Sequence, residues 1–125
     1  MSFDETGRGF AEQWRACFAG ERGHLAGVYG PTSLLTWNGT QLQGVDSIMN
    51  HLLNLNTGAV IYGTVDIDCH PLQNNGVMIV SNGELKMNEE DHSLSFNDVI
   101  VLAVSDAGQY YVANQIFRIL GGGSV

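Results

Sequence analysis

Two carboxylates and an imidazole stand at alternate positions of one predicted strand, where they could bind a divalent metal or act as an acid and a base. Asp66, Asp68 and His70 are spaced i, i+2 and i+4, so in an extended chain their side chains share one face. Carboxylate and imidazole groups bind several divalent metals and transfer protons. However, alternate strand residues stand ~6.5–7 Å apart, which is too wide for a compact site, and no further ligands accompany them. We therefore interpret the three residues as a solvated strand end.

A tryptophan beside a turn and a run of acidic residues could instead recognise a ligand. Trp37 precedes the dipeptide Asn38-Gly39, and Glu89, Glu90 and Asp91 are consecutive. Taken by themselves, the tryptophan is typical of a core aromatic, and charge runs are usually solvated. The two features can be interpreted in terms of function only when the whole sequence is considered.

The composition indicates one globular domain with an acidic surface. The chain has 125 residues, of which 44% are apolar, as expected for a single folded domain. Its five Lys and Arg residues face thirteen Asp and Glu residues, which gives a formal charge of −8. Such a surface repels phosphate backbones. We therefore expect no nucleic-acid partner and favour a basic protein surface.

The cysteines and the apolar runs indicate the compartment. Cys17 and Cys69 are too few for a disulfide framework, and we expect free thiols that pack rather than react. No run approaches the ~20 apolar residues of a membrane helix, and the first twenty residues lack the pattern of a signal peptide. We expect no membrane insertion and a place in the cytoplasm or nucleus.

The first half of the chain predicts helices and a hairpin. Apolar residues recur at helical spacing from Asp4 to Phe18 and from Val45 to Leu55, and the stretch from Gly20 to Gly30 holds a short helix. Asn38-Gly39 between Ser33–Trp37 and Thr40–Gln43 is a strong hairpin signal.

The second half predicts strands only. They run over Ala59–Cys69, Gly76–Met87, Ser93–Val104 and Tyr110–Leu120, and short turns between them favour an antiparallel meander. Helices first and strands later predict an α+β fold, with the helices on one face of a curved sheet. We expect one domain over residues 1–120 and a flexible Gly-rich tail over residues 121–125.

The predicted strands are apolar on both faces. Met78 and Val80 alternate with Val77 and Ile79, whereas a sheet with one face in water alternates apolar with polar residues. Three helices can cover one face, so the other face needs a partner. A second copy of the chain is the simplest one, and we expect a homodimer.

Several segments, in order, resemble the nuclear transport factor 2 family. They are the hairpin residues Leu35-Thr36-Trp37 and Gln41-Leu42-Gln43-Gly44, the first helix with Phe10 and Phe18, the stretch from Leu25 to Tyr29, and the last strand, YYVANQIFRI, from Tyr110 to Ile119. The resemblance covers nearly the whole chain. It implies a cone-shaped curved antiparallel sheet wrapped by about three helices from the N-terminal half, which dimerises through its outer face. It also implies a non-enzymatic carrier without a cofactor, which binds the GDP-bound form of the small GTPase Ran and the Phe-Gly repeats of nucleoporins.

The resemblance assigns roles to particular residues. In the family an apolar cavity accepts an aromatic side chain of Ran, and acidic groups at its mouth hold basic residues of Ran. Asn38 stands where the family usually has Glu, Tyr62 where it often has His, and Asn88 where the acidic loop usually begins, so the mouth departs from the pattern. The cavity residues are then Trp37, Leu55, Val60, Leu94 and Phe117, the mouth residues Asn38, Tyr62, Asn88, Glu89, Glu90 and Asp91, the nucleoporin residue Phe3, and the dimer residues Val80 and Ile116.

Two alternatives stay open. One is a scaffold module of the same fold that binds Phe-Gly peptides without Ran, which the altered mouth favours. The other is an isomerase or dehydratase, because cone folds also host such enzymes. Enzymes of that kind place a titratable group deep in the pocket, and no residue assigned to the cavity is titratable.

Overall fold

The computed structural model describes residues 2–88 and 92–120. Glu89, Glu90 and Asp91, which we predicted to form an acidic loop, and the predicted Gly-rich tail over residues 121–125 lie outside the described residues.

Helix α1 (Phe3–Ala19) begins at a capping box and ends at Gly20. The Ser2 hydroxyl accepts a hydrogen bond from the Glu5 backbone N–H at 3.1 Å, which satisfies one of the free donors of the first turn. Gly7, which weakens a helix by its propensity, is needed for packing. A Cβ built there would lie 2.5 Å from the Cys69 Sγ, so glycine allows α1 to approach the sheet this closely without displacing that side chain.

The predicted hairpin and second helix are confirmed, with one change of helix type. A 3-10 helix η1 (Arg22–Val28) leads into β1 (Tyr29–Trp37) and β2 (Thr40–Gln43), and α2 (Val45–Leu53) follows. Asn38 and Gly39 have φ values of 47° and 89°, as a tight two-residue hairpin turn requires at both central positions.

The four predicted strands of the second half are β3 (Val60–Pro71), β4 (Val77–Met87), β5 (Leu94–Val104) and β6 (Tyr110–Leu120), with a short 3-10 helix η2 (Gln73–Asn75) between β3 and β4. They form the expected antiparallel meander within a six-stranded sheet of order β2-β1-β6-β5-β4-β3 in the described part of the chain. The sheet is not antiparallel throughout, because β1 pairs with β6 in parallel. Short turns made the other pairings predictable, whereas no turn joins these two distant segments.

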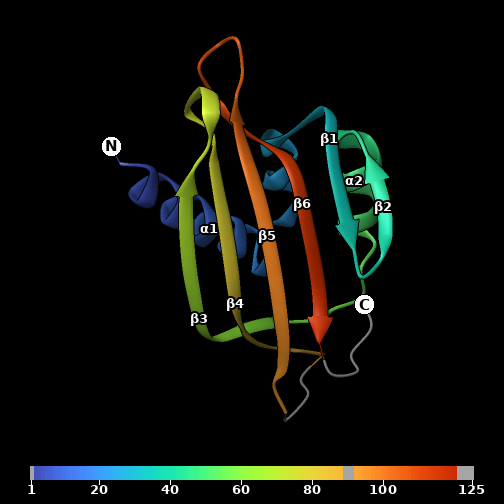
Figure 1. Cartoon of the computed structure of the whole chain (residues 1–125). Coiled ribbons are helices and arrows are strands. Elements are labelled where there is room, and N and C mark those ends of the chain that lie inside the picture. The colour runs from blue at the N-terminus through green and yellow to red at the C-terminus, as the bar shows by residue number, and fades with distance from the viewer. Residues whose placement is uncertain (1, 89–91, 121–125) are drawn as a thin grey trace.

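The helices cover one face of the curved sheet, as predicted, and the α+β fold class is confirmed. Figure 1 shows α1 behind β3 and β4, and α2 behind β1 and β2, while no helix within residues 2–88 and 92–120 covers the other face. The core lies between the two layers and includes the buried side chains Trp14, Phe18, Leu35, Ile79, Ile100 and Val112.

Candidate functional site

An aromatic cluster lies on the inner face where β1 and β6 end. The parallel register sets Trp37 beside Phe117, and their rings stack with centroids 4.0 Å apart. Phe18 of α1 lies 5.5 Å from Trp37, and Phe96 of β5 lies 5.9 Å from Phe117. The structure therefore brings together the two aromatics predicted to line a cavity and adds two that the prediction missed.

The two aromatic side chains at the centre of the cluster are buried. Trp37 is 2% exposed and Phe117 3% exposed, and Val60 is buried, while Leu55, Tyr62 and Leu94 are half-buried against the same core. The five predicted cavity residues and Tyr62, one of the six predicted mouth residues, thus belong to one apolar cluster. The Trp37 Nε1, the Asn38 Nδ2 and the His51 Nε2 are buried without a hydrogen-bond partner among the described residues.

Asn38, which we predicted to lie at the cavity mouth, stabilises the hairpin turn. Its side-chain oxygen accepts a hydrogen bond from the Ile119 N–H at 2.8 Å, and its own N–H donates to the Phe117 carbonyl at 2.9 Å. Its positive φ of 47° favours asparagine over glutamate, because a short amide tolerates the left-handed region. The residue therefore fastens the hairpin turn to the end of β6.

Asn88 has a similar task at the end of β4. Its φ is 57°, and its N–H donates to the Thr57 carbonyl at 2.7 Å. The Thr57 hydroxyl in turn accepts from the Arg22 guanidinium at 2.8 Å, and Arg22 lies over the Phe18 ring at 4.0 Å. Both asparagines at the mouth thus hold turns together rather than present charge.

A buried polar chain crosses the sheet interior, and the sequence analysis did not anticipate it. The Trp14 indole N–H donates to the Tyr29 hydroxyl at 2.9 Å, and that hydroxyl donates to the Gln115 side-chain oxygen at 2.6 Å. The Gln115 amide nitrogen then donates to both Asp98 carboxylate oxygens, at 3.0 and 3.3 Å. The alternation of side chains along β5 could have indicated that Asp98 is buried, because Phe96, Asp98 and Ile100 share the inner face of the sheet.

Burial dominates the electrostatics of this chain. It raises the pKa of Asp98 to about 7, although the Gln115 hydrogen bond and the charge of Arg15 act in the opposite direction. Burial also raises the pKa of Tyr29 and of Tyr62. A carboxyl group that titrates near neutral pH therefore lies inside the fold, although Asp98 is only 5% exposed.

A shallow hollow surrounds Phe3 at the start of α1. Phe3 is 42% exposed, and Leu72 and Tyr110, which line the same hollow, are each 39% exposed. The hollow has a volume of about 270 Å³. Phe3 is the residue that we predicted for the nucleoporin site, and the structure places Leu72 and Tyr110 beside it. No local sequence pattern indicates this neighbourhood, because three distant segments meet there.

The outer face carries the two residues predicted for a dimer seam. Ile116 is 54% exposed while the adjacent Phe117 is buried, so the predicted opposite directions of these side chains are confirmed. Cross-strand pairing sets Val80 beside Val99 and Val99 beside Ile116. An apolar row therefore crosses the centre of the uncovered face.

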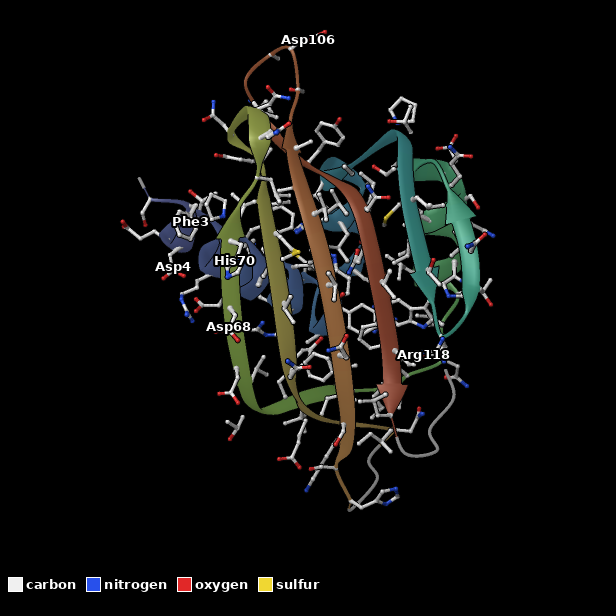
Figure 2. All side chains as sticks on the ribbon, viewed as in Figure 1. Phe3, Asp4, Asp68, His70, Asp106 and Arg118 are labelled. Carbon is white, nitrogen blue, oxygen red and sulfur yellow. The ribbon has the colours of Figure 1, made fainter. Side chains whose placement is uncertain are left out.

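Asp66, Asp68 and His70 are exposed on β3, and Figure 2 shows the latter two along this edge strand. Among the described residues, no group of three or more His, Cys, Asp or Glu is arranged to hold a metal ion. Cys17 and Cys69 are free thiols, as predicted. No helix in residues 2–88 or 92–120 is long and apolar enough to span a membrane.

Comparisons of sequence and structure show which known proteins this chain is similar to. The nuclear transport factor 2 (NTF2) domain matches residues 6–119. Nuclear transport factor 2B of Arabidopsis thaliana is 32% identical over 120 residues, which are 95% of this chain and 95% of that protein. The solved structure of nuclear transport factor 2 from Cryptosporidium parvum is similar with a TM-score of 0.88 and 34% identity, and 94% of each chain is covered. A ketosteroid isomerase-like protein from Erwinia carotovora atroseptica, with a TM-score of 0.69, 14% identity and coverage of 93% and 95% of the two chains, shares the fold alone.

Proposed function

The chain belongs to the nuclear transport factor 2 domain family, and from this premise we propose that it is a nucleocytoplasmic transport adaptor. It binds the GDP-bound form of Ran and the Phe-Gly repeats of nucleoporins, works as a homodimer, and moves between cytoplasm and nucleus. The observation that carries the proposal is the family match, which spans residues 6–119 of the 125-residue chain.

The two ends of the sheet suit two separate partners. Trp37 and Asn38 lie where β1 and β6 end, and consecutive antiparallel strands bring Asn88 and Leu94 to that same end. The Phe3 hollow is built with Leu72 and Tyr110, which lie at the opposite end, where β3 stops and β6 starts. A carrier has to hold its cargo and contact the pore at the same time, and this separation supports that role.

The buried aromatics change how the Ran site is expected to work. Because Trp37 and Phe117 are packed against each other, an incoming aromatic side chain has to displace Tyr62, Leu55 or Leu94, which are only half-buried. In this proposal Glu89, Glu90 and Asp91 supply the negative charge at the mouth.

The Phe-Gly scaffold without Ran binding is the second candidate. It is favoured by Asn38 and Asn88, which stand where the resemblance implies carboxylates. Both asparagines stabilise turns through hydrogen bonds and carry no charge. An enzymatic role has weaker support. Asp98 is the interior carboxylate, but it is buried and both of its oxygens accept hydrogen bonds from Gln115.

We predict that Ran-GDP binds with a dissociation constant in the micromolar range or weaker, and that Ran-GTP binds at least tenfold more weakly. Isothermal titration calorimetry against both nucleotide forms measures this. Raised ionic strength should weaken the complex because charges at the mouth are screened. Replacing Glu89, Glu90 and Asp91 together by glutamine and asparagine should have the same effect, whereas Asp106→Asn, at the opposite end of the sheet, should not. Equal affinity for both forms, or none for either, would refute the carrier role.

Phe3→Ala is expected to weaken binding of a Phe-Gly repeat peptide about tenfold, because it removes part of an apolar contact worth ~1.5–3 kcal/mol when fully buried. The capping box uses Ser2 and Glu5, so helix α1 should stay folded. Fluorescence anisotropy with a labelled peptide measures the loss, and Leu53→Ala, an exposed leucine on α2, is the matched control. Unchanged affinity of the Phe3 variant would place the nucleoporin site elsewhere.

A further inference from the structure

A second, larger hollow adjoins the one at Phe3. Its volume is about 450 Å³, and it lies between the start of β1 and the β5–β6 turn. Gly30, Pro31 and Thr32 form one wall, and Asp106 stands on the other. Figure 2 shows Asp106 at the tip of the β5–β6 turn, far from Arg118 near the end of β6.

Tyr110 belongs to both hollows. Its side chain lines the hollow that contains Phe3 and Leu72, and it also lines the hollow that contains Asp106. The tyrosine is 39% exposed, so it forms a ridge between two adjoining depressions. A ligand in extended conformation can therefore lie across Tyr110 and occupy both.

The two hollows differ in chemistry. The first presents Phe3, Leu72 and Pro71, while the second presents a carboxylate and a second aromatic ring, Tyr111. Among the described residues that line either hollow, none is a lysine or an arginine. A cationic side chain is attracted both by a carboxylate and by the faces of aromatic rings.

The turn holds Asp106 in a defined position without neutralising it. The Ser105 N–H donates to the Gln109 carbonyl at 2.8 Å, and the Gly108 N–H donates to the Ser105 carbonyl at 2.9 Å. Gly108 has a φ of 81°, which closes the turn. No hydrogen bond or ion pair engages the Asp106 carboxylate within the described chain, so it is free to pair with a ligand.

From this geometry we propose that the peptide site extends from the Phe3 hollow into the Asp106 hollow and selects a basic residue a few positions away from the aromatic one. The aromatic side chain of the peptide packs against Phe3 and Leu72, the backbone crosses Tyr110, and a lysine or arginine pairs with Asp106. This inference rests on the proposed nucleoporin site and adds a charge preference to it.

The test uses the full chain and labelled synthetic peptides in fluorescence anisotropy. Each peptide carries one Phe-Gly pair and, after a Gly-Ser spacer of about two to six residues, either a lysine or a glutamine. We expect the lysine peptide with the best spacer to bind about three- to fivefold more tightly than its glutamine twin, as for one partly exposed ion pair. The preference should vanish at high ionic strength.

Asp106→Asn should abolish the preference while leaving the affinity for the glutamine peptide unchanged, and Asp46→Asn, an exposed carboxylate on α2, should keep the preference. Tyr110→Ala should weaken both peptides, because the ridge serves both hollows. Phe-Gly binding without any preference for lysine, or a preference that survives Asp106→Asn, would overturn the extension alone. If neither peptide binds, the proposed nucleoporin site fails as well.

Discussion

Replacing Asp98 by asparagine is expected to stabilise the protein by several kcal/mol at pH 8 and to change its stability little near pH 4. Burial raises the pKa of Asp98 from 3.8 to about 7, so between these values the folded state keeps a proton that the unfolded chain has lost. The contribution of this group to stability is therefore complete below pH 3.8 and is lost as the pH rises through about 7. The loss is on the order of 4 kcal/mol.

Asparagine is the informative replacement because it has the shape of the neutral acid at every pH. Its side-chain oxygen can still accept the shorter of the two hydrogen bonds from the Gln115 amide, while its amide nitrogen replaces the oxygen that accepts the longer one. The bonds from Gln115 through Tyr29 to Trp14 are not changed. Urea unfolding followed by tryptophan fluorescence gives the free energy of unfolding of variant and parent at both pH values. The difference between the two proteins cancels the titration of the other carboxylates.

The other groups near Asp98 define what would contradict this expectation. Arg15 is the charge that favours the ionised carboxylate, and its guanidinium also lies 5.8 Å from the centre of the Tyr62 ring. If Arg15 compensates the charge fully, Asp98→Asn should destabilise the protein at pH 8 rather than stabilise it. Asp66→Asn, an exposed carboxylate on β3, is the control and should shift stability by less than about 0.5 kcal/mol at either pH.

The elements could be predicted because each has a local signal. Asn38-Gly39 specified a tight hairpin, and the alternation from Tyr110 to Leu120 specified β6 with its inner and outer faces. The parallel pairing of β1 with β6 had no such signal, since it depends on contacts between segments that are far apart in the chain. The capping box at Ser2 was also encoded locally, and it fixes where α1 starts.

The candidate site was less predictable, because exposure depends on what packs above each residue. Trp37 and Phe117 were predicted to line a cavity, and the structure adds that their rings stack in the core, which no local pattern indicates. The alternation of Asp98 with apolar neighbours indicates that it lies on the inner face of the sheet. Its hydrogen-bond partner Gln115 comes from another strand, so the sequence pattern of β5 does not indicate the pair. The hollow around Phe3 needs Leu72 and Tyr110 from two other elements, which no local pattern joins.

Replacing Ile116 by glutamate is expected to convert a two-fold dimer into folded monomers or aggregates. Ile116 lies in the apolar row with Val99 and Val80 on the face that no helix covers. A patch that meets its own copy across a two-fold axis would bring two glutamates together in a dry interface, at a cost of several kcal/mol. The dimer dissociation constant should rise at least about a hundredfold. Sedimentation equilibrium at tens of micromolar protein measures it, and far-UV circular dichroism checks the fold.

Leu53→Glu is the matched control for the dimer. Leu53 is 56% exposed and Ile116 54% exposed, so both changes place a carboxylate where an exposed aliphatic side chain stood. Leu53 lies on α2, on the helical side of the sheet, and its variant should remain dimeric. A parent protein that stays monomeric at tens of micromolar would refute the dimer itself. A dimeric Ile116→Glu variant would refute only the position of the seam. If the variant is instead a folded monomer, its binding of the Phe-Gly peptide shows whether the Phe3 hollow is complete within a single chain.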